Sequence, residues 1–305
     1  MKILILGAGA VGLSLAAKLS RVSDVVAVTR SRYLQVLINE GISISGAWGT
    51  ETVHFPCTSG VVPRDDFDYI VLTTKSYDTE SVCCEYADFI KDHETVSLQN
   101  GIGNEETISR FTDRVIGGVV MTGFVREGPG QVRITANAGP MQLGRFPSGS
   151  DASVEEFAGL LQTAGIAAEV TGEIKVHLWS KALINAVLNP LSAILGVTYG
   201  ELTSPEVWQI IEEIVHEFYT AARAEGIRLQ WPEPDIFLGY LHGVLIPVMA
   251  THTSSMLQDI LSGKRSEIQY LNGAVVQTGI RHGIPVPYNT CITNLIRTKE
   301  RIHRI

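Results

Sequence analysis

The sequence predicts an α/β domain with a mostly parallel, doubly wound sheet, followed by an all-α domain. Three observations lead to this prediction. Short apolar runs alternate with helix-like stretches in the first half, a glycine-rich turn follows the first run, and long helical patterns fill the second half. At about 150 residues per domain, a chain of 305 residues has room for two, and we place the boundary after residue 171.

The predicted first domain alternates strands and helices, as βαβ units do. Its apolar runs are rich in β-branched residues, which is typical of parallel strands buried on both faces. The predicted strands are residues 2–6, 24–29, 69–73, 95–98 and 167–170, and the predicted helices are residues 10–19, 31–40 and 151–164. Residues 42–45 and 52–55 flank a Gly-Ala-Trp-Gly turn and predict a hairpin, and residues 114–144 are strand-rich.

The predicted second domain consists of long helices that glycines separate. The predicted helices are residues 174–195, 205–225, 238–261, 265–282 and 289–304. Gly226, Gly263 and Gly283 lie between them, where glycine commonly ends a helix. The apolar helices after residue 205 fit packing within one subunit or in a homodimer, and we expect the homodimer.

The composition argues against several classes of protein. The net charge of −8 repels polyanions, so we expect no nucleic-acid partner. The cysteines and histidines have no metal-site spacing, so we expect no metal. The most apolar stretch near the start, residues 3–17, is shorter than the about 20 residues of a membrane span and lacks a cleavage signal. We therefore expect a cytoplasmic protein with no membrane partner.

A glycine-rich turn links the first predicted strand to the first predicted helix. It matches GxGxxG with Gly7, Ala8, Gly9, Ala10, Val11 and Gly12. In such a turn the glycines allow a tight bend and a close approach of a pyrophosphate, whose charge the helix N-terminus stabilises. The alternative is a plain packed strand–turn–helix unit. The context favours a Rossmann domain that binds a dinucleotide through these six residues.

The end of the second predicted strand indicates which dinucleotide binds. An NAD site usually has an acidic residue there, for the ribose 2′-hydroxyl. This chain has Thr29, Arg30, Ser31 and Arg32 instead. A guanidinium group forms charge-assisted hydrogen bonds with phosphate, whereas the alternative is a pair of solvated surface arginines. We predict NADP(H) as the cofactor, with Arg30 at its 2′-phosphate.

Three polar residues share one face of an apolar helix in the second domain. Lys181, Asn185 and Asn189 are spaced four apart. Burying such groups without partners costs about 1–3 kcal/mol each, so a ligand is a natural partner. The alternative is a solvated stripe, but asparagine is unfavourable inside a helix. The spacing therefore predicts a binding face.

Four further residues are candidates by position. Lys75 and Asn100 follow two predicted strands, at the edge where parallel sheets bind ligands. Ser255 begins a polar helical face that includes Asp259. Glu267 lies beyond Gly263 and is either a site residue or a surface carboxylate.

These segments together resemble the ketopantoate reductase family, the 2-dehydropantoate 2-reductases. The matching segments are residues 7–12, 73–76, 98–101, 179–181, 254–259 and 270–273, with Asn185, Asn189 and Glu267. The resemblance implies that Lys181 and Glu267 are catalytic. It implies substrate-binding roles for Asn185, Asn189, Ser255 and Asn100. It implies that Lys75 and Asn100 lie beside the cofactor and that Arg30 holds its 2′-phosphate.

The reaction that the resemblance implies is transfer of hydride from NADPH to 2-dehydropantoate, a small 2-oxo acid. The product is (R)-pantoate, in pantothenate and coenzyme A biosynthesis. Residues 1–171 would bind NADP(H), and residues 172–305 would bind substrate and carry catalysis. Glu267 would pair with Lys181 or bind a substrate hydroxyl. The alternatives are a related NADP-dependent dehydrogenase with a different 2-oxo acid or hydroxy acid as substrate, and a non-catalytic NADP(H) sensor.

Overall fold

The computed structural model describes residues 1–62 and 66–303, which form two compact units. The first unit comprises Met1–Gln99 and Asn104–Lys175, and the second comprises Asn100–Gly103 and Val176–Ile305. This division places the loop after residue 99 with the helical unit. The separate roles predicted for residues 1–171 and 172–305 stay a prediction.

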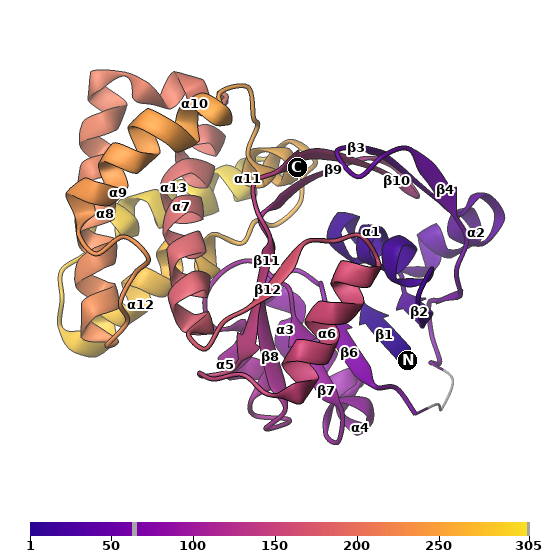
Figure 1. The fold of residues 1–305 in the computed structure, drawn as a ribbon. Helices are drawn as coiled ribbons and strands as arrows, with labels where there is room; N and C mark the ends of the chain where they lie inside the picture. Colours follow the sequence, from indigo (N-terminus) through magenta and orange to yellow (C-terminus); the bar gives the residue numbers. More distant parts are fainter. Residues whose placement is uncertain (63–65, 304–305) are drawn as a thin grey trace. The chain divides into compact units, whose positions relative to one another are not determined.

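An eight-stranded sheet forms the centre of the first unit (Figure 1). The strand order is β12-β11-β8-β7-β6-β1-β2-β5, and each pair is parallel except β8 with β11. The strands are β1 (Lys2–Leu6), β2 (Asp24–Val28), β5 (Cys57–Thr58), β6 (Tyr69–Leu72), β7 (Glu94–Ser97), β8 (Val115–Val119), β11 (Met141–Arg145) and β12 (Ala168–Val170). The predicted parallel α/β domain is therefore confirmed.

Helices cover both faces of this sheet, as the alternation along β1 shows. Ile3 and Ile5 belong to the same buried cluster as residues of α1 and α6, whereas Leu4 and Leu6 pack in a second cluster with residues of α3, α4 and α5. The helices are α1 (Ala10–Leu19), α2 (Ser31–Glu40), α3 (Thr79–Glu85), α4 (Ala87–Ile90), α5 (Asn104–Ile108) and α6 (Ala152–Thr163), with a short 3₁₀ turn η1 (Ser76–Asp78). Because consecutive strand residues point to opposite faces, the sheet is doubly wound.

A second sheet of four strands packs on α1 (Figure 1). Its order is β4-β3-β10-β9, from β3 (Ile42–Gly46), β4 (Glu51–Val53), β9 (Thr122–Gly128) and β10 (Gln131–Asn137). The predicted hairpin is confirmed as β3–β4. The parallel pairing of β3 with β10 was not predicted from the sequence. Ile44 and Ile134 of this sheet bury apolar surface against Leu13 of α1.

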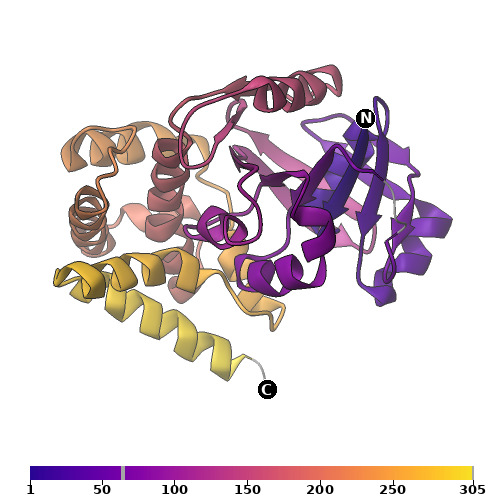
Figure 2. The ribbon, with the colours of Figure 1, turned by 90° about the horizontal axis from the view of Figure 1, so that it is seen from below.

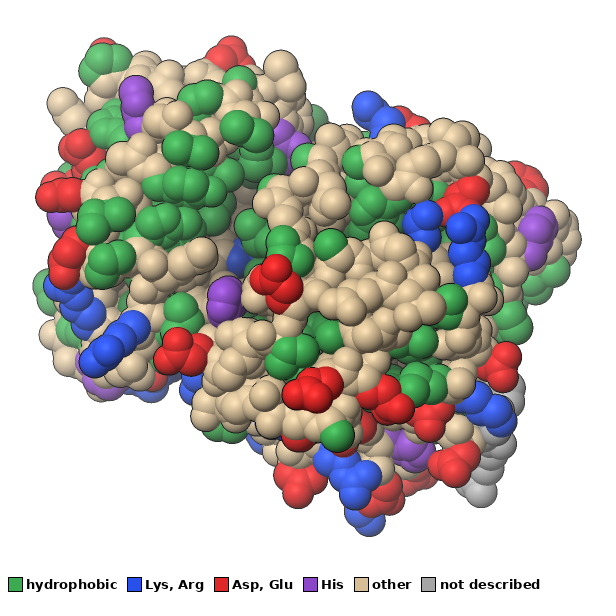
Figure 3. All heavy atoms as spheres, viewed as in Figure 1, with side chains coloured by type: hydrophobic (Ala, Val, Ile, Leu, Met, Phe, Trp, Pro, Cys, Tyr) green, Lys and Arg blue, Asp and Glu red, His purple; other side chains and the backbone are tan. Residues whose placement is uncertain are grey.

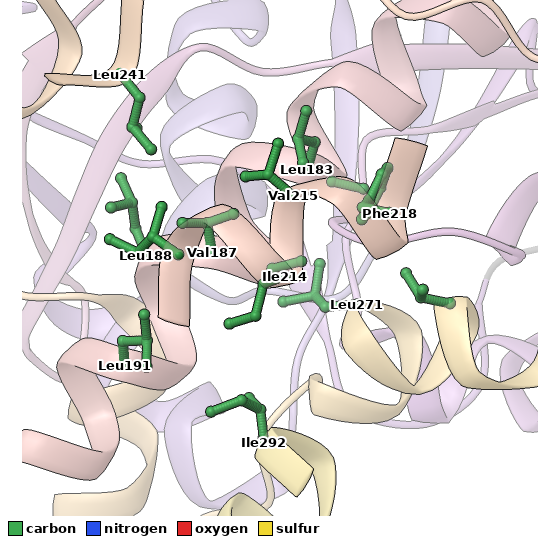
Figure 4. Packing of buried hydrophobic residues seen from close by; sticks show 14 of the residues in the cluster. Leu183, Val187, Leu188, Leu191, Ile214, Val215, Phe218, Leu241, Leu271 and Ile292 are labelled. Carbon is green, nitrogen blue, oxygen red and sulfur yellow. The ribbon is translucent and has the colours of Figure 1, made fainter. Parts of the chain in front are cut away.

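The second unit is helical, as predicted. Its elements are α7 (Ile174–Leu195), η2 (Tyr199–Thr203), α8 (Pro205–Ala224), α9 (Pro234–Tyr240), a π-helical turn η3 (Leu241–Leu245), α10 (Ile246–Val248), α11 (Ser255–Leu261), η4 (Ile268–Tyr270), α12 (Asn272–His282) and α13 (Pro287–Ile302). Figure 2 shows α12 and α13, in yellow, side by side. Figure 4 shows the core between them and α7, with Val187, Ile214 and Leu271 facing one another.

Two of the predicted helices are wrong in part. The prediction over residues 238–261 fails because the chain leaves the helix at residues 249–254. There the carbonyls of Ala250 and His252 accept bonds from Gly200 and Tyr199, and Ser254 caps α11 by accepting from the Leu257 N–H at 3.0 Å. The prediction over residues 265–282 holds only from Asn272 onward, after the separate turn η4. The predicted end of the last helix at residue 304 lies outside the described residues.

The helical unit has a long apolar helix that is mostly buried, and it also has apolar side chains exposed on its surface. Within the described part of the chain, α7 is the one helix long and apolar enough to cross a membrane, and 72% of its most apolar window is buried, as in a core helix. Figure 3 shows hydrophobic side chains gathered on the helical unit, on the side where α9 and α10 lie in Figure 1. The exposed large hydrophobic residues of α9, η3 and α10 are Ile236, Val244 and Val248.

Candidate active site

The glycine-rich turn after β1 has the geometry of a phosphate-binding turn. Gly7 has φ of +111°, and a Cβ there would lie 2.7 Å from the Thr74 nitrogen. A Cβ on Gly12 would clash with the Gly7 carbonyl. By contrast, a Cβ on Gly9 would meet no described atom within 4 Å, at the residue that caps the N-terminus of α1. Two glycines are thus required by packing, and the third leaves open space in front of a helix N-terminus. This arrangement fits a pyrophosphate.

Basic side chains lie beside this turn, at the end of β2. Arg30 caps the N-terminus of α2, its side chain is 68% exposed, and its Nη2 lies 3.8 Å from Oδ2 of Asp78. Arg32 and Arg126 both place their guanidinium carbons over the ring of Tyr33, at 4.7 and 4.1 Å. Arg30 and Arg32 are both exposed, and the role of Arg30 at a 2′-phosphate stays a prediction.

A buried hydrogen-bond network fixes the loop that carries Lys75. The Gln99 amide nitrogen donates to the Thr74 carbonyl and to the Thr79 hydroxyl, each at 2.9 Å. The Thr79 hydroxyl donates to the Asn104 side-chain oxygen at 3.0 Å. Gln99, Thr79 and Asn104 are at most 6% exposed. None of these three was predicted from the sequence, although Gln99 precedes Asn100 in one of the segments that resemble the family.

In the second unit, Lys181 and Glu267 interact electrostatically. Lys181 lies on α7, and Glu267, which is 7% exposed, caps η4. Burial lowers the pKa of Lys181 to about 8, and the negative charge of Glu267 partly opposes that shift. A lysine with such a pKa is a competent proton donor near neutral pH.

Asn189 and Ser254 form a buried polar cluster next to the same helix. The Tyr199 hydroxyl donates to Oδ1 of Asn189 at 2.6 Å, and the Ser254 hydroxyl donates to the Asn189 carbonyl at 3.2 Å. These two bonds fix the position of Asn189 on α7, and Tyr199 occupies one of the two acceptor positions of Oδ1. Asn185 is half-buried on the same face of α7, and Ser255 is exposed. Tyr199 was not predicted from the sequence, because no regular spacing relates it to Asn189.

The loop that carries Asn100 is held against the segment that follows Glu267. The Ile102 N–H donates to the Tyr270 carbonyl at 2.8 Å. Gly101 has φ of +94°, and a Cβ there would lie 2.7 Å from the Tyr270 Cβ. The second unit therefore holds the loop that carries Asn100 against the segment that follows Glu267.

Among the residues that the structure describes, no group of three or more His, Cys, Asp or Glu side chains could hold a metal ion.

Comparison with known proteins decides the family. The family model "Ketopantoate reductase PanE/ApbA" matches residues 3–148, and the model "Ketopantoate reductase PanE/ApbA C terminal" matches residues 173–300. The chain belongs to the ketopantoate reductase family. The resemblance stated from the sequence is thereby confirmed.

Individual relatives agree over the full length of the chain. A Pyrococcus horikoshii protein named 2-dehydropantoate 2-reductase is 34% identical, covering 99% of this chain and 98% of that protein. The crystal structure of a PanE/ApbA family ketopantoate reductase from Ralstonia eutropha is 30% identical, with a TM-score of 0.90 and full coverage of both chains. A ternary structure of D-mandelate dehydrogenase with NADH and anilino(oxo)acetate is 28% identical, with a TM-score of 0.91 and the same coverage. The roles of the individual site residues stay predictions.

Proposed function

We propose that this protein is an NADPH-dependent oxidoreductase that reduces the ketone of 2-dehydropantoate to the alcohol of pantoate, in pantothenate biosynthesis. The observation that carries the proposal is Lys181, a lysine whose pKa burial lowers to about 8 beside the buried Glu267. A dinucleotide-binding turn alone fits a sensor as well as an enzyme. Reduction of a carbonyl group needs a proton donor, and a lysine whose pKa lies near neutral pH beside amide side chains at helical spacing suits that role. Full-length relatives named 2-dehydropantoate 2-reductase support the choice of substrate.

The cofactor would bind to the first unit. The turn of residues 7–12 would hold the pyrophosphate, Arg30 the 2′-phosphate, and Lys75 would lie alongside. Bound NADPH would supply the hydride that adds to the carbonyl carbon. The open space at Gly9 supports this placement, because a backbone without a side chain lets the pyrophosphate reach the N–H groups of α1.

Catalysis would rest on charge and proton control in the second unit. As the carbonyl carbon is reduced, its oxygen gains negative charge, and the Lys181 ammonium would stabilise that charge and donate the proton. Glu267 would keep Lys181 protonated, because its carboxylate raises the lysine pKa against the effect of burial. Asn100, Asn185, Asn189 and Ser255 would bind the carboxylate and hydroxyl of the substrate. Tyr199 would orient the Asn189 amide.

A second candidate is the same chemistry on a different 2-oxo acid. D-mandelate dehydrogenase, whose bound ligand anilino(oxo)acetate is itself a 2-oxo acid, matches this fold with a TM-score of 0.91. The Lys181–Glu267 pair would act on any 2-oxo acid, so the substrate depends on the side-chain end of the pocket.

Steady-state kinetics separates these candidates. NADPH consumption is followed with 2-dehydropantoate and with a panel of aliphatic and aromatic 2-oxo acids. We expect the highest kcat/KM with 2-dehydropantoate. A higher value with an aromatic acid would establish the second candidate. Cofactor binding without turnover on any of them would overturn both and leave a sensor.

We also propose a cytoplasmic homodimer. The four cysteines are all free, which fits a reducing compartment. The exposed Ile236, Val244 and Val248 of the helical unit offer an apolar surface for a second copy. Light scattering on the purified chain and on Val248→Glu tests the assembly. A monomeric wild type would contradict it.

A further inference from the structure

Asp78 places a negative charge beside the arginine proposed for the 2′-phosphate. Its Oδ2 lies 3.8 Å from Nη2 of Arg30, and the two side chains are 36% and 68% exposed. Asp78 ends the turn η1 and directly precedes α3, so it comes from a different βα connection than Arg30. The sequence at the end of β2 therefore contains Arg30 but gives no sign of Asp78.

The sheet order puts this pair at the nucleotide turn. β1 lies between β2 and β6, with parallel pairing on both sides. The turn of residues 7–12 follows β1, Arg30 follows β2, and Asp78 follows β6. Because parallel strands end at one edge, the carboxylate and the guanidinium approach each other beside the strand end that carries the nucleotide turn.

We propose that Asp78 sets the preference between phosphorylated and unphosphorylated dinucleotides by weakening the selectivity that Arg30 confers. This inference rests on the proposed cofactor site. A 2′-phosphate on Arg30 is repelled by the Asp78 carboxylate, whereas a 2′-hydroxyl is a hydrogen-bond donor that a carboxylate accepts. The pair therefore combines the recognition groups of both cofactor types.

The neighbouring arginines make different contacts from Arg30. Arg32 and Arg126 lie over the ring of Tyr33, and Arg126 donates through Nε to the Gly128 carbonyl at 3.2 Å. D-mandelate dehydrogenase, a solved structure of the same fold, is described with NADH, so the fold accommodates the unphosphorylated dinucleotide.

The test measures cofactor affinity, not turnover. The dissociation constants of NADPH and NADH are measured by dihydronicotinamide fluorescence for the wild type and Asp78→Asn. Asparagine and aspartate are similar helix N-caps, so the start of α3 is preserved. Removing one unit charge a few ångströms from a phosphate changes an equilibrium about five- to tenfold in water. We expect the affinity ratio of NADPH over NADH to rise by about that factor.

Glu80→Gln is the matched control. Glu80 lies two residues further on and pairs with Arg110 at 3.1 Å on the surface, so its loss should leave the ratio unchanged. At 1 M salt, where the Debye length is about 3 Å, the effect of Asp78→Asn should shrink.

Two results would overturn the inference. If Asp78→Asn weakens NADPH binding as much as NADH binding, the carboxylate merely orients Arg30. If the ratio stays at the wild-type value, Asp78 has no part in the choice. Both results leave the proposed function intact, whereas a wild type that binds neither cofactor overturns the proposed function as well.

Discussion

Two lysines of this chain have pKa values that burial lowers, and their surroundings differ. Lys18 lies in the last turn of α1 in the first unit, where its ammonium lies 2.7 Å from Oε1 of Glu51 and donates to the Trp48 carbonyl at 3.1 Å. These contacts tie α1 to the β3–β4 hairpin. Lys181 lies on a helix face with two asparagines and close to the buried Glu267. One lysine joins two elements of the fold, and the other stands among groups that bind ligands.

Burial of a lysine does not by itself indicate a role in chemistry. Both ammonium groups lose hydration, and both have a carboxylate that offsets the loss. What distinguishes Lys181 is the set of amide side chains at helical spacing. Variants that remove one lysine at a time test whether the two lysines have different roles.

The largest expected effect is on turnover in Lys181→Ala. Loss of a general acid costs about 10²- to 10⁴-fold in rate. We expect kcat to fall by that order while the dissociation constant of NADPH, measured by fluorescence, stays near the wild-type value. Lys18→Met is the matched control, and its kcat per folded molecule should be unchanged. Comparable losses of kcat in both variants would remove the distinction between the two lysines.

The next effect is on the pH profile. Because Lys181 must be protonated to donate, and its pKa is lowered to about 8, kcat/KM should decline as the pH rises above about 8. Glu267 raises that pKa, so Glu267→Gln should move the decline to lower pH, by about one unit for a nearby opposite charge. Rates measured from pH 6 to 10 test this. A shift to higher pH would contradict the assigned role of Glu267.

Local patterns in the sequence were sufficient for most of the fold. The bounds of α7 agree with the predicted residues 174–195, because apolar periodicity and the following glycine are local signals. The pairing of β3 with β10 could not be predicted, because these strands are far apart in the sequence and β10 also pairs with β9. The helix predicted over residues 238–261 failed because tertiary hydrogen bonds to η2 hold residues 250 and 252 outside a helix.

The residues of the candidate site likewise fall into those with a local sequence pattern and those without one. The glycine turn and the Lys181 face have regular spacing, so the sequence predicts them. Gln99, Tyr199 and Asp78 act through contacts with residues 10 or more positions away, or in other elements. No periodicity encodes such contacts, because they depend on how separate elements pack.

Removing Lys18 should affect stability more than chemistry. Lys18→Met deletes the ion pair with Glu51 and the bond to the Trp48 carbonyl, leaving polar groups without a partner at about 1–3 kcal/mol. Arg21 also pairs with Glu51 and limits the loss. We expect a lower midpoint in urea with an unchanged slope. An unchanged midpoint would show that the pair contributes nothing to the link between α1 and the hairpin.

A further effect concerns how stability depends on pH, through Glu105, a buried carboxyl group whose Oε1 has no hydrogen-bond partner among the described residues. It is 1% exposed, and burial raises its pKa to about 7. Between pH 4.5 and 7 the folded protein therefore keeps a proton that the unfolded chain has released, so the free energy of unfolding falls as the pH rises through this window. Glu105→Gln should flatten that decline by about 1–3 kcal/mol, whereas Glu106→Gln, next in sequence, should retain it. Urea unfolding at pH 5 and pH 8 measures both variants, and parallel behaviour of the two would mean that Glu105 ionises as freely as a surface residue.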